Sequence, residues 1–400
     1  MMVVFGAFFS VVSRQAFAAP IRAYLPGLWY VPDGIVASAV MVLFVAYLYR
    51  SDITALFWIA VVLACSILSL AALDPLSVLF GVRQVFALIV AVVVGLHFRQ
   101  LGVVVRPLML AICAASIAGA IYDSLLEFPW SGLVFEGAFG TNDVSRVWWT
   151  DGESRRIAGL GIASTDTALL IVCATLIVST GLDRGSRLAA VLLIGPAVYA
   201  VWLAQQRATI VWFGFFWLVA CVLPILMGPR VLPMVVAMLR SIGIAAAGLC
   251  MVVPFALYGL DIGRLTGATV YSLDDRTMNV WPWAIDRLSE FPTVLIGAGI
   301  GSVGEAVAFT DPALAIAPDN MFLFLYTSLG VGALLLVGLL FLKIHDVDDH
   351  NPDMLPALSI LSILLFNGIT ANILNGMVGV CFLGLAIGML WSNRNEANAL

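Results

Sequence analysis

Long apolar runs separated by short polar connections dominate this chain of 400 residues. The hydrocarbon core of a bilayer is about 30 Å thick, and an α-helix needs roughly 20 apolar residues to cross it. Runs of about that length recur about twelve times, which predicts an all-α fold, a polytopic transmembrane helical bundle of about 12 helices. The predicted spans cover residues 3–18, 32–49, 55–73, 78–98, 103–121, 164–182, 188–204, 208–227, 242–258, 320–342, 355–369 and 371–391.

Two long connections, residues 122–163 and 259–319, interrupt this rhythm inside a single predicted transmembrane domain, residues 1–400. Binding and catalytic residues concentrate on loops that a rigid scaffold positions, so we expect the active site there. The second loop also predicts an amphipathic helix beginning near Val280. Pro282 fits its first turn, and Trp281, Ile285 and Leu288 fall on one apolar face.

Basic residues of the short loops gather on one side of the predicted bundle. They are Arg50, Arg99, Arg184, Arg187, Arg230, Arg240, Lys343 and Arg394. Because short loops rich in Lys and Arg stay in the cytoplasm, both termini are predicted to be cytoplasmic and both long loops periplasmic, in a bacterial inner membrane. The N-terminal apolar segment has no positive region before it, so we expect a first span there and not a signal peptide.

Composition supports a membrane protein and excludes some function classes. Hydrophobic residues make up 62% of the chain and charged residues only 11%, whereas soluble domains average about 25% charged residues. The basic residues are all arginine except Lys343, and no basic run is present, which argues against nucleic acid as a partner. Arginine binds phosphate oxygens in a bidentate manner and stays charged when partly desolvated, so the bias favours phosphate chemistry.

Several arginines stand where charge is expensive. Arg155 and Arg156 precede the span that opens near Ser164, where a basic pair can clamp an anionic lipid headgroup or simply remain solvated. Arg207 lies in a tight connection between two spans, and Arg83 lies within a span. Such charges face the bundle interior or an aqueous cavity, or else extend to the interface.

The second long loop adds further candidates. Arg276 precedes its amphipathic helix, and Arg287 lies on the polar face of that helix. At the end of the loop, Asp319 and Asn320 begin the next span, where they are either helix caps or, for Asp319, a general base.

Two other motifs are weaker. The segment GIGSVG, residues 299–304, matches a dinucleotide-binding fingerprint, but no βαβ unit can form here, so we expect its glycines to allow sharp turns. The three histidines fall on the cytoplasmic side of the predicted topology, so no imidazole base is expected on the loop side. Neither a metal site nor a cofactor is predicted.

The order of these motifs resembles that of the O-antigen polymerase and ligase superfamily, chiefly over residues 155–342. The residues that carry the resemblance are Arg156 and Gly159 entering a helix, Arg207 at a tight turn, Arg276, Trp281, Pro292, Gly297 and Gly299 in the second loop, and Asp319, Asn320, Leu329, Gly330 and Gly332 at the following helix. Many relatives carry histidine where this chain has Asp319.

The resemblance implies a metal-independent, inverting glycosyltransferase whose donor is a glycan on undecaprenyl pyrophosphate. By the resemblance, Arg207 and Arg276 would bind the pyrophosphate with support from Arg156. The residues themselves make Asp319 the candidate that accepts the proton of the acceptor hydroxyl. Four tryptophans can either stack on sugar rings or anchor the protein at the membrane interface: Trp148, Trp149, Trp281 and Trp283.

We therefore expect a polysaccharide polymerase that joins lipid-linked repeat units, with a chain-length regulator and a flippase as partner proteins. The alternatives are a ligase that transfers the glycan to lipid A core or protein, and a transporter or flippase without chemistry. A transporter is expected to show discontinuous helices in paired halves.

Overall fold

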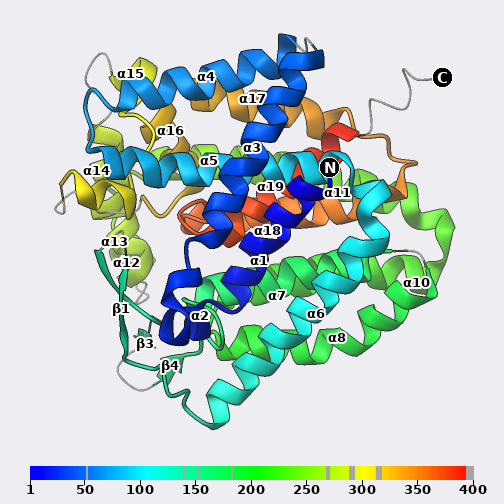
Figure 1. Ribbon diagram of the computed structural model, residues 1–400. Coiled ribbons are helices and arrows are strands. Elements are labelled where there is room, and N and C mark those ends of the chain that lie inside the picture. Colours follow the sequence, from blue (N-terminus) through cyan, green and yellow to red (C-terminus); the bar gives the residue numbers. More distant parts are fainter. Residues whose placement is uncertain are drawn as a thin grey trace.

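The computed structural model is a bundle of α-helices with two short β-hairpins at one end (Figure 1). It describes residues 1–50, 53–137, 140–146, 148–150, 154–181, 183–266, 271–287, 293–311 and 318–392. Among these residues, seven helices are long and apolar enough to cross a membrane, or up to eight if one pair bent by 81° counts as a single span. The predicted all-α membrane bundle is thereby confirmed.

The long helices coincide with predicted spans. The bent pair is α1 (Met2–Ala16) and α2 (Ala18–Tyr24). The others are α3 (Val31–Arg50) with the 3₁₀ turn η1 (Pro26–Leu28), α5 (Pro75–Leu96), α6 (Phe98–Leu125), α8 (Arg184–Leu203), α9 (Arg207–Trp217) continued by the π-helix η2 (Leu218–Val222) and α10 (Leu223–Met227), α11 (Leu232–Ala256) after η3 (Pro229–Val231), and α18 (Leu355–Thr370) after η7 (Pro352–Met354).

The remaining predicted spans are shorter apolar helices. They are α4 (Ile53–Ser69), α7 (Ser164–Ser179), α16 (Met321–Leu329) followed by α17 (Gly332–His345), and α19 (Met377–Ser392). A helix of 16 residues is about 24 Å long, less than the hydrocarbon thickness. Nearly every residue of α7 and α19 is buried by neighbouring helices, so protein can cover their ends in place of lipid. Twelve complete crossings remain a prediction.

Close contact between α5 and α19 holds the centre of the bundle together. A Cβ at Gly388 would lie only 2.8 Å from the Gly95 Cα and would collide with the Val92 carbonyl oxygen, and one at Gly384 would lie 2.7 Å from the Leu88 carbonyl oxygen. Small residues four apart let membrane helices approach until their backbones touch. The sequence segment GLAIG, residues 384–388, therefore sets the spacing of these two helices.

The first long loop forms two antiparallel hairpins. One pairs β1 (Val134–Gly137) with β2 (Gly140–Asp143), and the other pairs β3 (Trp148–Thr150) with β4 (Ser154–Arg156).

The second long loop is helical in pieces: α12 (Ile262–Thr266), α13 (Tyr271–Asp275), the π-helix η4 (Arg276–Val280), α14 (Trp281–Asp286), α15 (Thr293–Ile296) and η5 (Ala306–Phe309). The helical run begins at Tyr271, earlier than the predicted start near Val280, and Leu288 lies outside the described residues. Its buried stripe, Thr277, Trp281 and Ala284, contacts the bundle.

Both long loops lie at one end of the bundle, the end that carries the hairpins in Figure 1. Helix direction places the basic short-loop residues at the other end, because α5 leads away from this end to Arg99 and α9–α10 lead away to Arg230. At that far end Lys343 lies 5.1 Å from the ring centroid of Trp391, near the end of α19. The structure thus separates a loop end from a basic end.

Candidate functional site

A cavity of about 670 Å³ opens at the loop end of the bundle. Its walls come from many elements: the ends of α1 and α18, the beginnings of α5, α7, α9 and α19, and both long loops. Of the described residues, three arginines (Arg22, Arg83 and Arg146) and three carboxylates (Asp166, Glu305 and Asp319) line it. Its wall also carries six side-chain amides: Gln15, Asn142, Gln206, Asn367, Asn372 and Asn375. Charged and amide groups of this kind suit a polar, anionic ligand with many hydroxyl groups.

Arg83 reaches the cavity from the third turn of α5 and belongs to a buried ion network. Its Nε lies 3.6 Å from Asp33 Oδ1, while Arg14 Nη1 donates to Asp33 Oδ2 at 2.7 Å and to the Trp29 carbonyl oxygen at 3.1 Å. The Arg14 side chain is 1% exposed. Two guanidinium groups therefore share the Asp33 carboxylate beside the cavity.

Arg22 comes from α2, the short helix that follows the bend after α1. Its guanidinium lies 4.2 Å from the centroid of Trp29 and 5.3 Å from that of Phe135, and Nη1 donates to the Asp143 carbonyl oxygen at 2.7 Å. These contacts orient the group without neutralising it. No carboxylate of the described residues forms an ion pair with Arg22.

Arg146 and Glu305 form an ion pair that joins the two long loops across the cavity wall. Burial alone would lower the pKa of the Arg146 guanidinium, but the charge and hydrogen bond of Glu305 raise that pKa above its ordinary value. Glu305 is placed by docking of the second loop on α5. There Thr310 accepts a hydrogen bond from the Asp74 amide at 2.9 Å, and Gly301 lies directly against Ser77.

The predicted role of the GIGSVG glycines is confirmed. Gly299, Gly301 and Gly304 have φ values of 100°, 87° and 70°, a region that side chains rarely adopt. A Cβ at Gly299 would lie 2.7 Å from Ser69 Oγ. The glycines thus turn the loop tightly against neighbouring helices.

Asp319 lines the cavity beside the start of α16, as an ion pair with Arg276. Arg276 Nε donates to Asp319 Oδ2 at 3.1 Å. Burial raises the pKa of the Asp319 carboxyl, although Arg276 opposes this shift. The Asp319 backbone has a φ of 42°, a left-handed conformation that costs a residue with a side chain about 1–3 kcal/mol.

Arg207 faces a second space, a cleft of about 510 Å³ beside the cavity, together with Arg155, Gln205 and Trp202. Gln206, the N-cap of α9, and Thr209 line the cavity. Arg207 and Ile210 line the cleft, because successive helical residues point about 100° apart. The resemblance implied that Arg207 and Arg276 bind one ligand together. In the structure, Arg207 lines the cleft, and Arg276 lines neither the cleft nor the cavity. Gln205, which turns the chain into α9, has a φ of 55°.

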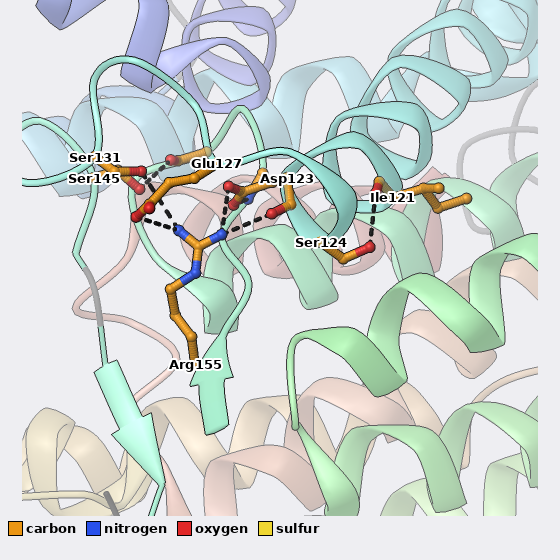
Figure 2. A network of polar contacts seen from close by, with 9 residues as sticks. Ile121, Asp123, Ser124, Glu127, Ser131, Ser145 and Arg155 are labelled. Atoms are coloured by element: carbon orange, nitrogen blue, oxygen red, sulfur yellow. Dashed lines mark hydrogen bonds and ion pairs between the residues drawn. The ribbon is translucent and has the colours of Figure 1, made fainter. Parts of the chain in front are cut away.

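Arg155 attaches the first long loop to the end of α6, as Figure 2 shows. Its Nη2 donates to both Asp123 Oδ1 and the Asp123 carbonyl oxygen at 2.7 Å, and Nη1 approaches Glu127 and Ser131 at 3.4 Å. Asp123 also accepts from the Gly159 amide at 3.1 Å. The Arg155 guanidinium is thus occupied by protein groups, which explains how the loop end is positioned.

Other predicted residues lie in the protein framework. Asn320 is the N-cap of α16: its Oδ1 accepts from the Leu323 amide, and its Nδ2 donates to the carbonyl oxygens of Cys250 and Ile369. Its alternative reading as a helix cap is therefore confirmed. Trp281 is fully buried against Ala284 and Leu323, so neither ring face is open to a sugar.

Arg287 and Arg156 lie outside both the cavity and the cleft. Arg287 lies 5.5 Å from the Trp283 centroid, and burial lowers the pKa of its guanidinium. Arg156 ends β4, where its backbone pairs with Trp148. The side chains of Trp148 and Trp149 lie outside the described residues.

The cavity contains groups that sequence reasoning did not select. Arg22 follows an apolar run and belongs to no polar motif of the sequence. Asp166 lies in the first turn of α7, where a carboxylate is common because it interacts favourably with the helix dipole. Their shared signal was an ionisable side chain at the loop end of a predicted span. Sequence spacing alone could not show that they face the same space.

Among the described residues, no three His, Cys, Asp or Glu side chains come together as they would around a metal ion. The sequence matches no protein family model, and no curated protein matches it. The function is therefore argued from the site itself.

Proposed function

We propose that the protein is a polysaccharide polymerase, a glycosyltransferase that joins lipid-linked repeat units at the loop end of the bundle without a metal ion. One observation carries this proposal: a cavity at the end of a membrane helix bundle is lined by Arg22, Arg83 and Arg146 and also by carboxylates and amides. The first set of groups suits a diphosphate, and the second suits sugar hydroxyl groups.

The chemistry requires charge stabilisation and proton transfer. The anomeric carbon–oxygen bond to the diphosphate breaks as an acceptor hydroxyl attacks, so negative charge develops on the departing lipid diphosphate. Guanidinium groups held in place before the reaction stabilise that charge most in a site shielded from water. A carboxylate of the cavity accepts the hydroxyl proton.

Arg22 and Arg83 are the arginines best placed for the leaving group. Arg22 has no carboxylate partner among the described residues, and Arg83 shares Asp33 with Arg14. Arg146 is already paired with Glu305 and holds the wall in place. Neither the Arg207 nor the Arg276 side chain lines this cavity. The pyrophosphate-binding roles that the resemblance implied for them stay predictions.

The proposal includes a bacterial inner membrane, with the loop end periplasmic and both termini cytoplasmic. The donor and acceptor are undecaprenyl-pyrophosphate-linked oligosaccharides that reach the cavity from the bilayer. A chain-length regulator and a flippase would act beside the enzyme, one limiting polymer length and the other supplying repeat units.

Purified protein in lipid nanodiscs tests the proposal when it is given synthetic repeat units linked to undecaprenyl pyrophosphate. We expect a ladder of longer lipid-linked products on gel electrophoresis. Arg83→Gln should reduce the rate about 10- to 100-fold, because a charged hydrogen bond contributes about 1.5–3 kcal/mol. Arg230→Gln, an exposed arginine at the basic end, is the matched control and should leave the rate unchanged.

The alternatives give different results in the same assay. Transfer of the whole glycan to added lipid A core without a ladder would identify a ligase. Unmodified substrate exchanged between leaflets would identify a carrier. Folded protein that leaves the repeat units unchanged in length would refute the polymerase proposal.

A further inference from the structure

Among the residues that the structure describes, three carboxylates line the cavity, and they differ in what they already bind. Glu305 forms an ion pair with Arg146, and Asp319 forms one with Arg276. Asp166 forms no ion pair or hydrogen bond with any residue that the structure describes. A general base must offer a lone pair to a substrate hydroxyl, and that lone pair is available on Asp166.

The protein leaves room for this carboxylate. Asp166 stands in the first turn of α7 and faces the beginning of α19, where a Cβ at Gly376 would collide with Asp166 Oδ1 and lie 3.3 Å from its Cγ. Arg146, Glu305 and Arg22 are the charged groups near enough to interact with it. Burial and Glu305 oppose ionisation of this carboxyl, whereas Arg146 and Arg22 favour the ionised form, which is the form that accepts a proton.

We propose that Asp166 is the general base that activates the acceptor sugar, an inference that rests on the proposed polymerase function. The acceptor hydroxyl lies between Asp166 and the anomeric carbon of the donor. Its proton moves to the carboxylate as its oxygen bonds to the anomeric carbon, and the bond from that carbon to the diphosphate breaks. The leaving diphosphate keeps the electron pair beside Arg22 and Arg83, and Asp166 later returns the proton to water.

This assignment moves the base away from Asp319, the residue favoured by the sequence. The Asp319 carboxylate is held by Arg276 of the second loop, so its evident contribution is to fix that loop at the cavity wall. A positioning role of this kind changes substrate affinity, whereas loss of the base slows the chemical step.

The first experiment compares the wild type with Asp166→Asn in the ladder assay. We expect the variant to lose at least 100-fold in turnover while it binds undecaprenyl pyrophosphate with unchanged affinity, measured by microscale thermophoresis. A variant that makes the ladder at the wild-type rate would overturn this inference alone. Absence of a ladder from folded wild-type protein would instead overturn the polymerase function and this inference with it.

Sodium azide separates a base from a merely structural residue. Azide is already an anion, so it attacks the anomeric carbon without a base and releases lipid diphosphate together with a glycosyl azide. Azide should restore diphosphate release by Asp166→Asn at least tenfold but should not restore it in Arg83→Gln, which lacks a group for the leaving diphosphate. An Asp166→Asn protein that binds undecaprenyl pyrophosphate normally and gains nothing from azide would overturn the assignment.

Gly376→Ala provides a second test of the Asp166 assignment, in which residue 166 itself is not substituted. Its added methyl should displace the carboxylate, lower turnover at least tenfold and respond to azide as Asp166→Asn does. Wild-type turnover by folded Gly376→Ala would show that the position of this carboxylate does not matter, which also overturns the assignment.

Discussion

Burial and an ion pair act in opposite directions on the pKa of Asp319 at the cavity wall. Burial at Asp319 favours the neutral carboxyl, whereas Arg276 favours the carboxylate, and the net effect is a raised pKa. The left-handed backbone at this residue adds strain that the surrounding structure must support. Asp319 is thus held at a cost in stability, which is expected of a residue that keeps a site ready for its ligand.

The raised pKa gives Asp319 a defined effect on stability against pH. A carboxyl that binds its proton more tightly in the folded state stabilises the fold below its ordinary pKa of about 3.9, and this contribution is lost as pH rises through the raised folded pKa. Asp319→Asn removes the titration. The melting temperature of the wild type minus that of the variant should therefore fall as pH rises from 4 to 8.

Thermal unfolding in nanodiscs measures this difference, and Asp346→Asn, an exposed carboxyl at the basic end, is the control for general effects of charge removal. Asp275 also acts on Asp319 electrostatically and must be kept unchanged. A difference that rises with pH would mean that the attraction of Arg276 outweighs burial.

At the scale of elements, the contact between α5 and α19 depends on the absence of side chains. Gly388→Ala should lower stability by about 1–3 kcal/mol or more, because its methyl would press on the backbone of α5 and force the helices apart. Gly338→Ala is the matched control, because nothing lies within 4 Å of a Cβ at that position of α17. Thermal unfolding of both variants tests this, and equal melting temperatures would contradict tight helix contact.

The apolar pattern predicted the elements well, and the reason is physical. In a bilayer every backbone polar group must be satisfied within the segment, so a long apolar run has few alternatives to a helix. Every predicted apolar stretch coincides with a helix in the structure. The pattern could not show that α7 and α19 would be short and enclosed, because enclosure depends on which helices surround them.

The candidate site was predicted less completely for the same reason. Arg83 and Asp319, both candidates from the sequence, line the cavity, and a charge in or beside a span needs such an aqueous or polar environment. Arg207 also lies in a polar environment, but it lines the cleft and not the cavity. Trp281 packs against Ala284 and Leu323 in the protein interior. The direction of a side chain depends on the rotation of its helix about the helix axis. At the start of α9, neighbouring residues face different spaces, one the cavity and the next the cleft.

For the whole molecule, the separation of a loop end from a basic end predicts one topology. Basic short loops stay in the cytoplasm, so the end with Arg230 and Lys343 should face the cytosol and the cavity should face the periplasm. Both ends of the described chain agree with this arrangement: Gln15, at the end of α1, lines the cavity, whereas α19 starts at the cavity and leads away from it. This arrangement predicts an even number of crossings.

Thiol labelling in intact cells tests that topology. In a chain without its six native cysteines, an impermeant maleimide that crosses only the outer membrane should label Glu136→Cys in the first loop and Ser272→Cys in the second. It should not label His350→Cys at the basic end until the inner membrane is opened, although that histidine side chain is 81% exposed. Labelling of position 350 in intact cells would place the cavity in the cytosol, on the membrane face opposite the proposed donor and acceptor. The proposed function would then fail together with the topology, because substrate and arginines would be on opposite faces of the membrane.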